Sequence, residues 1–135
     1  MRDVSRSTKQ RHAICFMSAL HLHEHTTLWF NYPEVMFDIN ANIKRTDMEV
    51  IRTRNPQWDI GIELKDGYWI TNLERTIVDC LYHRNRADYH GIYAMRQAIA
   101  TKKSTDIKIM NMARQLGYHK RLRPFFDAFM TEGKY

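Results

Sequence analysis

The spacing of hydrophobic and polar positions predicts a helix at the start of the chain and a group of short strands after it. Apolar residues between positions 14 and 22 recur at helical spacing, which predicts a helix from about Thr8 to His23 with Ser7 or Thr8 as its cap. Pro33 and Pro56 then indicate that the helical pattern is interrupted in the following segment. Three runs rich in branched and aromatic residues predict strands there: Leu28–Tyr32, Val35–Ile39 and Glu49–Thr53.

The clearest β pattern runs from residue 60 to residue 70. Ile60, Ile62 and Leu64 alternate with polar or small residues, and Asp66-Gly67 supplies the residue types that a two-residue hairpin turn requires. The pattern therefore predicts a β-hairpin that ends at Ile70.

A helix follows this hairpin directly. Thr71 and Glu74 have the spacing of a capping box, which predicts a helix start at about Asn72. Arg75 and Asp79 are four residues apart, and we expect them to face each other on the outer surface. The expected buried stripe of this helix is made of Leu73, Ile77, Cys80 and Leu81.

The rest of the chain has helical periodicity. The helix after the hairpin is expected to end near Asn85, and the next one to run from about Asp88 to Lys102 with Ile92, Met95 and Ile99 inward. Another begins at a Ser104 cap, turns Ile107, Met110, Ala113 and Leu116 inward, and stops at Gly117. A last one covers about Arg123–Thr131, with Pro124 in its first turn and with Phe125, Phe126, Phe129 and Met130 packed.

Strands followed by a run of helices predict an α+β fold. We expect a small, mostly antiparallel sheet with an N-terminal helix and a C-terminal run of about four helices. Residues 1–12 are interpreted as a basic N-terminal arm and residues 13–135 as a single domain, because 135 residues are enough for one core.

Composition narrows the class of protein. Apolar residues make up 44% of the chain, yet no stretch approaches the ~18 apolar residues of a membrane span, and no signal-peptide core follows the basic start. A cytoplasmic protein is expected. Cys15 and Cys80 lie in apolar segments without zinc-type spacing, which predicts buried free thiols.

The distribution of charge suggests a binding surface. The chain has 21 lysines and arginines against 15 acidic residues, and none of these cations lies between Ala13 and Ile43. Cations in the C-terminal half predict contact with nucleic acid or an acidic partner, with stacking from Tyr118, Tyr93 and Trp58. The alternative is that they are solvated faces of ordinary helices. The candidate contact residues are Lys120, Arg121, Arg123, Lys102, Lys103, Arg84 and Arg86.

Two patterns raise other chemistries. His21, His23 and His25 lie close in sequence but lack the H-E-x-x-H arrangement, so we expect no metal site and a structural role at the end of the first helix. Glu63-Leu64-Lys65 matches the E-x-K element of Mg²⁺-dependent nucleases, with Asp38 or Asp59 as the second acid. A solvated hairpin face explains the same residues.

Catalysis is not expected. The sequence has no G-x-S-x-G elbow and no phosphate-binding glycine loop, and it contains five glycines in total. We therefore expect a non-enzymatic protein without a cofactor, and the Mg²⁺-dependent nuclease remains the enzymatic alternative.

Two sequence blocks carry a family resemblance. Ser18-Ala19-Leu20-His21-Leu22-His23, with Thr26-Thr27 behind it, precedes Ile70-Thr71-Asn72-Leu73-Glu74-Arg75-Thr76-Ile77-Val78-Asp79-Cys80. Together they resemble the C-terminal domain of AbiEi-type antitoxins, and Arg121-Leu122-Arg123-Pro124-Phe125 is similar to the closing helix of that family. The resemblance extends from about Ile14 to Met130.

The resemblance implies a bacterial antitoxin and transcriptional autorepressor of a type IV abortive-infection system. The partner toxin of such systems is similar to nucleotidyltransferases, and a stable toxin complex is not implied. The family usually carries an N-terminal winged helix-turn-helix, for which the twelve residues before Ala13 are too few. DNA contact is therefore expected from the basic arm, the C-terminal helices or a partner subunit. A further alternative is an accessory subunit of a plasmid or phage nucleoprotein complex.

Overall fold

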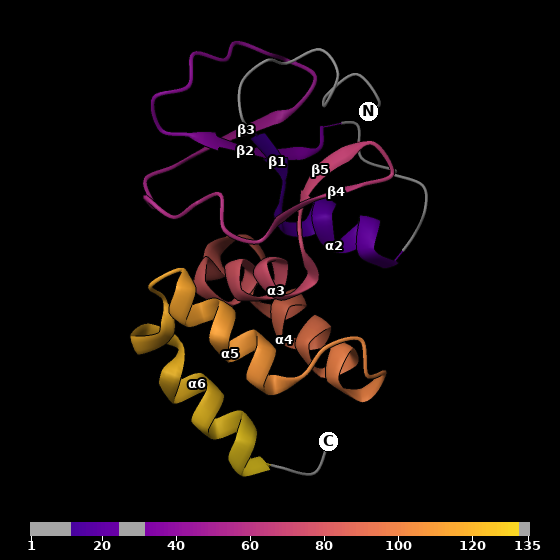
Figure 1. Cartoon of the computed structure of the whole chain (residues 1–135), viewed down its shortest axis with the longest axis vertical. Coiled ribbons are helices and arrows are strands. Elements are labelled where there is room, and N and C mark those ends of the chain that lie inside the picture. Colours follow the sequence, from indigo (N-terminus) through magenta and orange to yellow (C-terminus); the bar gives the residue numbers. More distant parts are fainter. Residues whose placement is uncertain (1–11, 25–31, 133–135) are drawn as a thin grey trace.

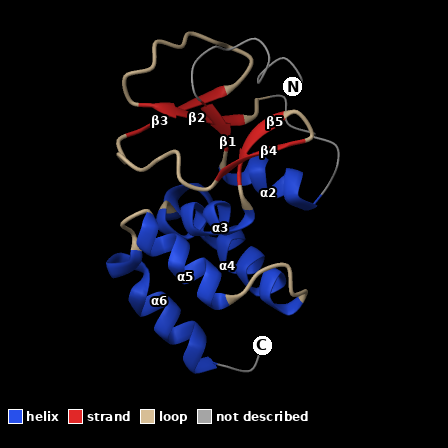
Figure 2. Ribbon diagram, in the orientation of Figure 1, coloured by secondary structure: helices blue, strands red, loops and turns tan. Residues whose placement is uncertain are grey.

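A computed structural model of the chain describes residues 12–24 and 32–132, and it has a sheet in one half and a run of helices in the other (Figures 1 and 2). The elements are β1 (His12–Ile14), α2 (Phe16–Glu24), β2 (Glu34–Asp38), β3 (Glu49–Thr53), β4 (Ile62–Lys65), β5 (Tyr68–Thr71), α3 (Leu73–Tyr82), α4 (Arg84–Ala100), α5 (Asp106–Gln115) and α6 (His119–Glu132). The predicted α+β class is confirmed.

The sheet is mixed and not mostly antiparallel, which corrects the prediction. Its strand order is β3-β2-β1-β5-β4. The pairs β1–β2 and β4–β5 are antiparallel, whereas β1–β5 and β2–β3 are parallel. The segment between Asp38 and Glu49 returns the chain so that β3 runs in the same direction as β2.

The first predicted helix starts too early. Residues 12–14 form the central strand β1, and α2 begins only at Phe16, whose φ of 49° marks the break between the two elements. All three residues of β1 are buried, and such a short apolar run is compatible with either a strand or a helix. The proposed caps Ser7 and Thr8 lie outside the described residues, as does the predicted strand Leu28–Tyr32 except for the exposed Tyr32.

The later strands agree closely with the prediction. β3 has the predicted bounds, β2 is displaced by one residue, and the hairpin β4–β5 turns at Asp66-Gly67. Asp66 and Gly67 have φ values of 52° and 84°, as a turn with two left-handed positions demands.

The cap of α3 is a different residue from the one predicted. Asn72 is the N-cap, and its side chain accepts a hydrogen bond from the backbone N–H of Arg75 at 2.8 Å. Thr71 stays in β5, fully buried, with its hydroxyl 2.7 Å from that of Thr76. Because Thr71 is held in the sheet, its side chain does not cap the helix, and the adjacent Asn72 is the N-cap.

The remaining helices exist as predicted with shifted ends. α3 stops at Tyr82 and α4 begins at Arg84, so the expected break near Asn85 lies inside α4. α5 is capped by Thr105, whose hydroxyl accepts from the Lys108 N–H at 3.2 Å, while the predicted cap Ser104 is buried.

The end of the chain shows two further differences. Gly117 has a φ of 78° and ends α5 as expected, but Ile107 on that helix is 66% exposed and does not point inward. α6 starts at His119, four residues earlier than predicted, so Pro124 lies inside it and not in its first turn.

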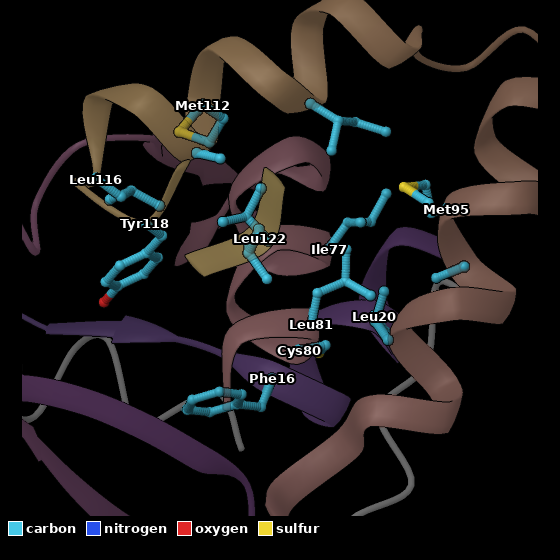
Figure 3. Packing of buried hydrophobic residues seen from close by; sticks show 14 of the residues in the cluster. Phe16, Leu20, Ile77, Cys80, Leu81, Met95, Met112, Leu116, Tyr118 and Leu122 are labelled. Carbon is cyan, nitrogen blue, oxygen red and sulfur yellow. The ribbon is translucent and has the colours of Figure 1, made fainter. Parts of the chain in front are cut away.

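α3 lies at the centre of the larger core cluster (Figure 3). α3 contacts α2, α4, α5 and α6, and its Ile77, Cys80 and Leu81 belong to this cluster, whereas Leu73 is only partly buried. A smaller cluster around Ile14 packs against the opposite face of the sheet. Cys15 and Cys80 are buried and are not joined in a disulfide, as predicted, and burial raises the pKa of Cys80.

None of the helices within residues 12–24 and 32–132 combines the length and the hydrophobicity that a membrane span requires.

Candidate functional site

The Arg75–Asp79 pair is buried, which overturns its predicted place on the outer surface. Both side chains have 0% exposure, and Arg75 Nε donates to Asp79 Oδ2 at 2.9 Å. Arg75 Nη1 also donates to the backbone oxygens of Trp58 and Ile60, at 2.5 and 2.6 Å. The guanidinium therefore ties α3 to the segment that leads into β4. Sequence spacing identified the pair but not the carbonyl groups that satisfy it from distant positions.

Asp79 is only partly satisfied in this site. Its Oδ1 has no hydrogen-bond partner among the described residues, and burial raises its pKa to about 6 although the Arg75 cation lowers it. Desolvation thus outweighs the attraction of the arginine. A perturbed pKa indicates a functional site when the group lies in a cleft. The Asp79 carboxyl is enclosed in the core, so we interpret the Arg75–Asp79 pair as part of the structural scaffold.

Further polar residues of the two resemblance blocks are also internal. The hydroxyl of Ser18, which is fully buried, accepts from the Glu34 N–H at 2.9 Å and connects α2 to β2. Thr76 donates to the backbone oxygen of Asn72 at 2.7 Å and meets the Thr71 hydroxyl, which connects α3 to β5. The blocks therefore encode how two helices attach to the sheet, and a contact surface has to be sought elsewhere.

Arg121 lies in such a surface, at the start of α6. Its guanidinium carbon is 5.2 Å from the centroid of the Tyr82 ring, and Nη1 is 3.5 Å from the Tyr82 hydroxyl. Tyr82 stacks on Tyr118 with centroids 3.8 Å apart and planes inclined by 10°, and His83 meets both rings edge-on. We call Tyr82, His83, Tyr118 and Arg121 the arginine–tyrosine cluster.

The side chains of Lys120 and Arg123 are exposed on either side of Arg121 in the sequence. Arg123 Nε is 3.8 Å from Asp127 Oδ2, and this pair is 80% and 68% exposed. At that exposure the pair is screened by water, so Arg123 retains much of its capacity to attract anions.

The seven predicted contact residues do not form one face. Lys102 and Lys103 follow α4, whereas Arg84 and Arg86 lie in its first turn, beside Tyr82 and His83. A helix of 17 residues is about 25 Å long, which separates the two groups. For Arg84 and Arg86 the structure describes the backbone alone.

The aromatic residues proposed for stacking differ in access. Trp58 is 6% exposed and Tyr118 is 9% exposed with one face against Tyr82, whereas Tyr93 is 56% exposed. Only Tyr93 among these three has a ring open to solvent. Sequence reasoning missed Tyr82 and His83, although an aromatic pair directly before Arg84 and Arg86 was a readable signal.

His23 has a structural role in the described part of the chain. His23 Nε2 lies 2.8 Å from the backbone oxygen of Thr71 and attaches the end of α2 to β5. Burial, with a smaller effect of Lys65, lowers the pKa of His23. His25 lies outside the described residues, and among those described no group of three His, Cys, Asp or Glu side chains is placed to hold a metal ion.

Glu63 and Lys65 lie on one face of the edge strand β4, as the nuclease hypothesis requires. Lys65 Nζ, however, is 3.4 Å from the backbone oxygen of Leu22. Asp38 belongs to β2, which is three strands from β4 and therefore about 14 Å away at the usual strand spacing. Asp59 lies in the turn before β4. The structure thus does not bring Asp38 together with the E-x-K element.

Comparison with protein-family models and with curated proteins found no match to this chain.

Proposed function

We propose that the protein binds nucleic acid through the arginine–tyrosine cluster and the adjacent cations of α6. The observation that carries the proposal is the position of Arg121 over Tyr82, with Lys120 and Arg123 exposed beside it. Stacked rings hold the guanidinium at the surface, so less conformational entropy is lost when it meets a phosphate. Lys120 and Arg123 add charge for the same backbone.

The biological class follows from the resemblance to AbiEi-type antitoxins. On this proposal the protein is a cytoplasmic, non-enzymatic regulator that binds DNA in a toxin–antitoxin system. Ser18 and Arg75, one from each resemblance block, are buried and hold the scaffold together. Recognition of a partner is then the role of exposed residues, which supports this proposal. The contact comes from the C-terminal helices, since the described residues offer this cluster and no helix-turn-helix with a wing.

Binding is tested by charge reversal with a charge-matched control. The variant Lys120→Glu/Arg121→Glu/Arg123→Glu is compared with Lys44→Glu/Arg54→Glu/Lys108→Glu, which changes three exposed cations elsewhere. Fluorescence anisotropy with labelled mixed-sequence DNA and RNA is measured across a salt series. Loss of three phosphate contacts reduces the slope of log K against log salt by about 3 for a duplex.

The control separates a specific surface from general positive charge. The proposal requires that the α6 variant loses affinity and salt dependence. In the control, the slope of log K against log salt must fall by less than half of the decrease that the α6 variant shows. Equal losses in the two variants, or binding that is unaffected in both, contradict it. Far-ultraviolet circular dichroism verifies that each variant is folded.

A further inference from the structure

A second feature, separate from the arginine–tyrosine cluster, is a cavity of about 410 Å³ between α2, α3, α4 and the edge strand β4. It lies along the C-terminal part of α4, whereas the cluster adjoins the first turn of that helix. Its lining is Leu20, His23, Lys65, Leu73, Tyr93, Ala94, Gln97, Ala98, Thr101 and Lys103. A volume in this range is typical of small-molecule sites.

One wall is a single face of α4. Tyr93, Gln97 and Thr101 follow one another at intervals of four residues, so Tyr93 and Thr101 are about 12 Å apart along the helix. Ala94 and Ala98 lie beside this row and also line the cavity. The wall therefore has an exposed aromatic ring at one end and, beyond Thr101, Lys103 at the other.

The polar groups of the lining favour an anion. Lys65 and Lys103 are cations, Gln97 offers an amide, and among the described residues no carboxylate lines the cavity. Lys65 Nζ is 3.4 Å from the Leu22 oxygen, which positions the ammonium group and leaves further N–H bonds for a ligand. Glu63 and Glu74 influence His23 electrostatically from outside the lining.

Apolar side chains complete the cavity. Leu20, Leu73 and the two alanines form a surface that suits the body of an organic molecule and not a bare ion. Tyr93, with its open ring, can stack on a planar group.

We propose that this cavity binds a mononucleotide, with the base against Tyr93 and the phosphate between Lys65 and Lys103. Tyr93, Gln97 and, beyond the end of α4, Lys103 follow the order of base, sugar and phosphate, and Lys65 adds a second cation from β4. The site is independent of nucleic-acid binding at α6, because it shares no residue with the arginine–tyrosine cluster.

The test uses isothermal titration calorimetry of the full chain with three probes: AMP, adenosine and inorganic phosphate. AMP is expected to bind at least tenfold more tightly than either of the other two, because only AMP engages both ends. Lys65→Gln/Lys103→Gln is expected to weaken AMP binding at least tenfold, and Tyr93→Ala at least threefold.

Lys44→Gln/Lys108→Gln serves as the control, since both lysines are exposed and outside the cavity. The proposal is overturned if AMP does not bind at millimolar concentration, if inorganic phosphate binds as tightly as AMP, or if the cavity variant and the control behave alike. The charge reversal of Lys120, Arg121 and Arg123 leaves AMP affinity unchanged, which distinguishes failure of this site from failure of the proposed function. Thermal melting of each variant identifies any that does not fold.

Discussion

The contribution of the buried Arg75 pair to the free energy of unfolding can be compared with that of an exposed pair of the same kind in the same protein. Arg75–Asp79 and Arg123–Asp127 are both arginine–aspartate pairs at i,i+4 on helices, but the first has 0% exposure and the second 80% and 68%. Local sequence spacing is identical in the two pairs. Any difference between Arg75→Met and Arg123→Met therefore reports tertiary environment.

The magnitude follows from the groups that each substitution leaves without a partner. Arg75→Met removes the hydrogen bonds that the Asp79 carboxyl and the carbonyl oxygens of Trp58 and Ile60 accept from the guanidinium. Breaking a buried pair from one side costs about 3–5 kcal/mol. Arg123→Met removes an exposed pair, for which at most about 1 kcal/mol is expected. Because a domain has a stability of about 5–15 kcal/mol, the first loss is a large fraction of the total.

Urea denaturation followed by tryptophan fluorescence measures both losses, and Trp58 is a reporter in the buried site itself. The double variant Arg75→Met/Asp79→Leu removes both charges and is expected to recover most of the lost stability. The reasoning is refuted if Arg75→Met lowers the free energy of unfolding by less than about 1 kcal/mol, or if it lowers it no more than Arg123→Met does.

Three further predictions concern stability. The pKa of Asp79 rises from 3.8 to about 6 on folding, so the folded state holds this proton more tightly, and the stabilisation from the bound proton is fully present below about pH 4 and is lost as pH rises through 6. In urea titrations, the stability of the wild type relative to Asp79→Asn is expected to fall by up to about 3 kcal/mol between pH 4 and pH 7. A difference that stays constant over this pH range contradicts the prediction. Gly91→Ala places a Cβ 3.0 Å from that of Cys80 and 3.1 Å from its backbone, where α4 crosses α3, so a loss of about 1–3 kcal/mol is expected in thermal unfolding, against little change for the exposed Asn111→Ala. Asn72→Ala removes the α3 cap and is expected to cost about 1 kcal/mol, whereas Asn72→Asp keeps an acceptor and stays near wild type; equal effects of the two changes contradict the capping role.

The candidate site was only partly readable from the sequence. The spacing of cations singled out Arg121 and its neighbours, and Tyr118 was among the expected aromatic residues. The structure adds Tyr82 and His83, which come from the end of α3 and stack on or meet Tyr118. The cavity beside Tyr93 had no sequence signal, because its walls come from four elements far apart in the chain. Side chains that meet only after folding leave no local pattern.

Features that depend on near neighbours in the chain could be predicted from the order of the amino acids. A few adjacent residues dictate the backbone at three places that were predicted from the sequence: the Asp66-Gly67 turn, the strand at residues 49–53 and the end of α5 at Gly117. Tertiary structure alone decided that residues 12–14 form the central strand, that Asn72 and not Thr71 caps α3, and that Arg75 is buried and not exposed. The physical reason is common to all three: burial and hydrogen bonding across the fold contribute more free energy than the local preference of any one segment.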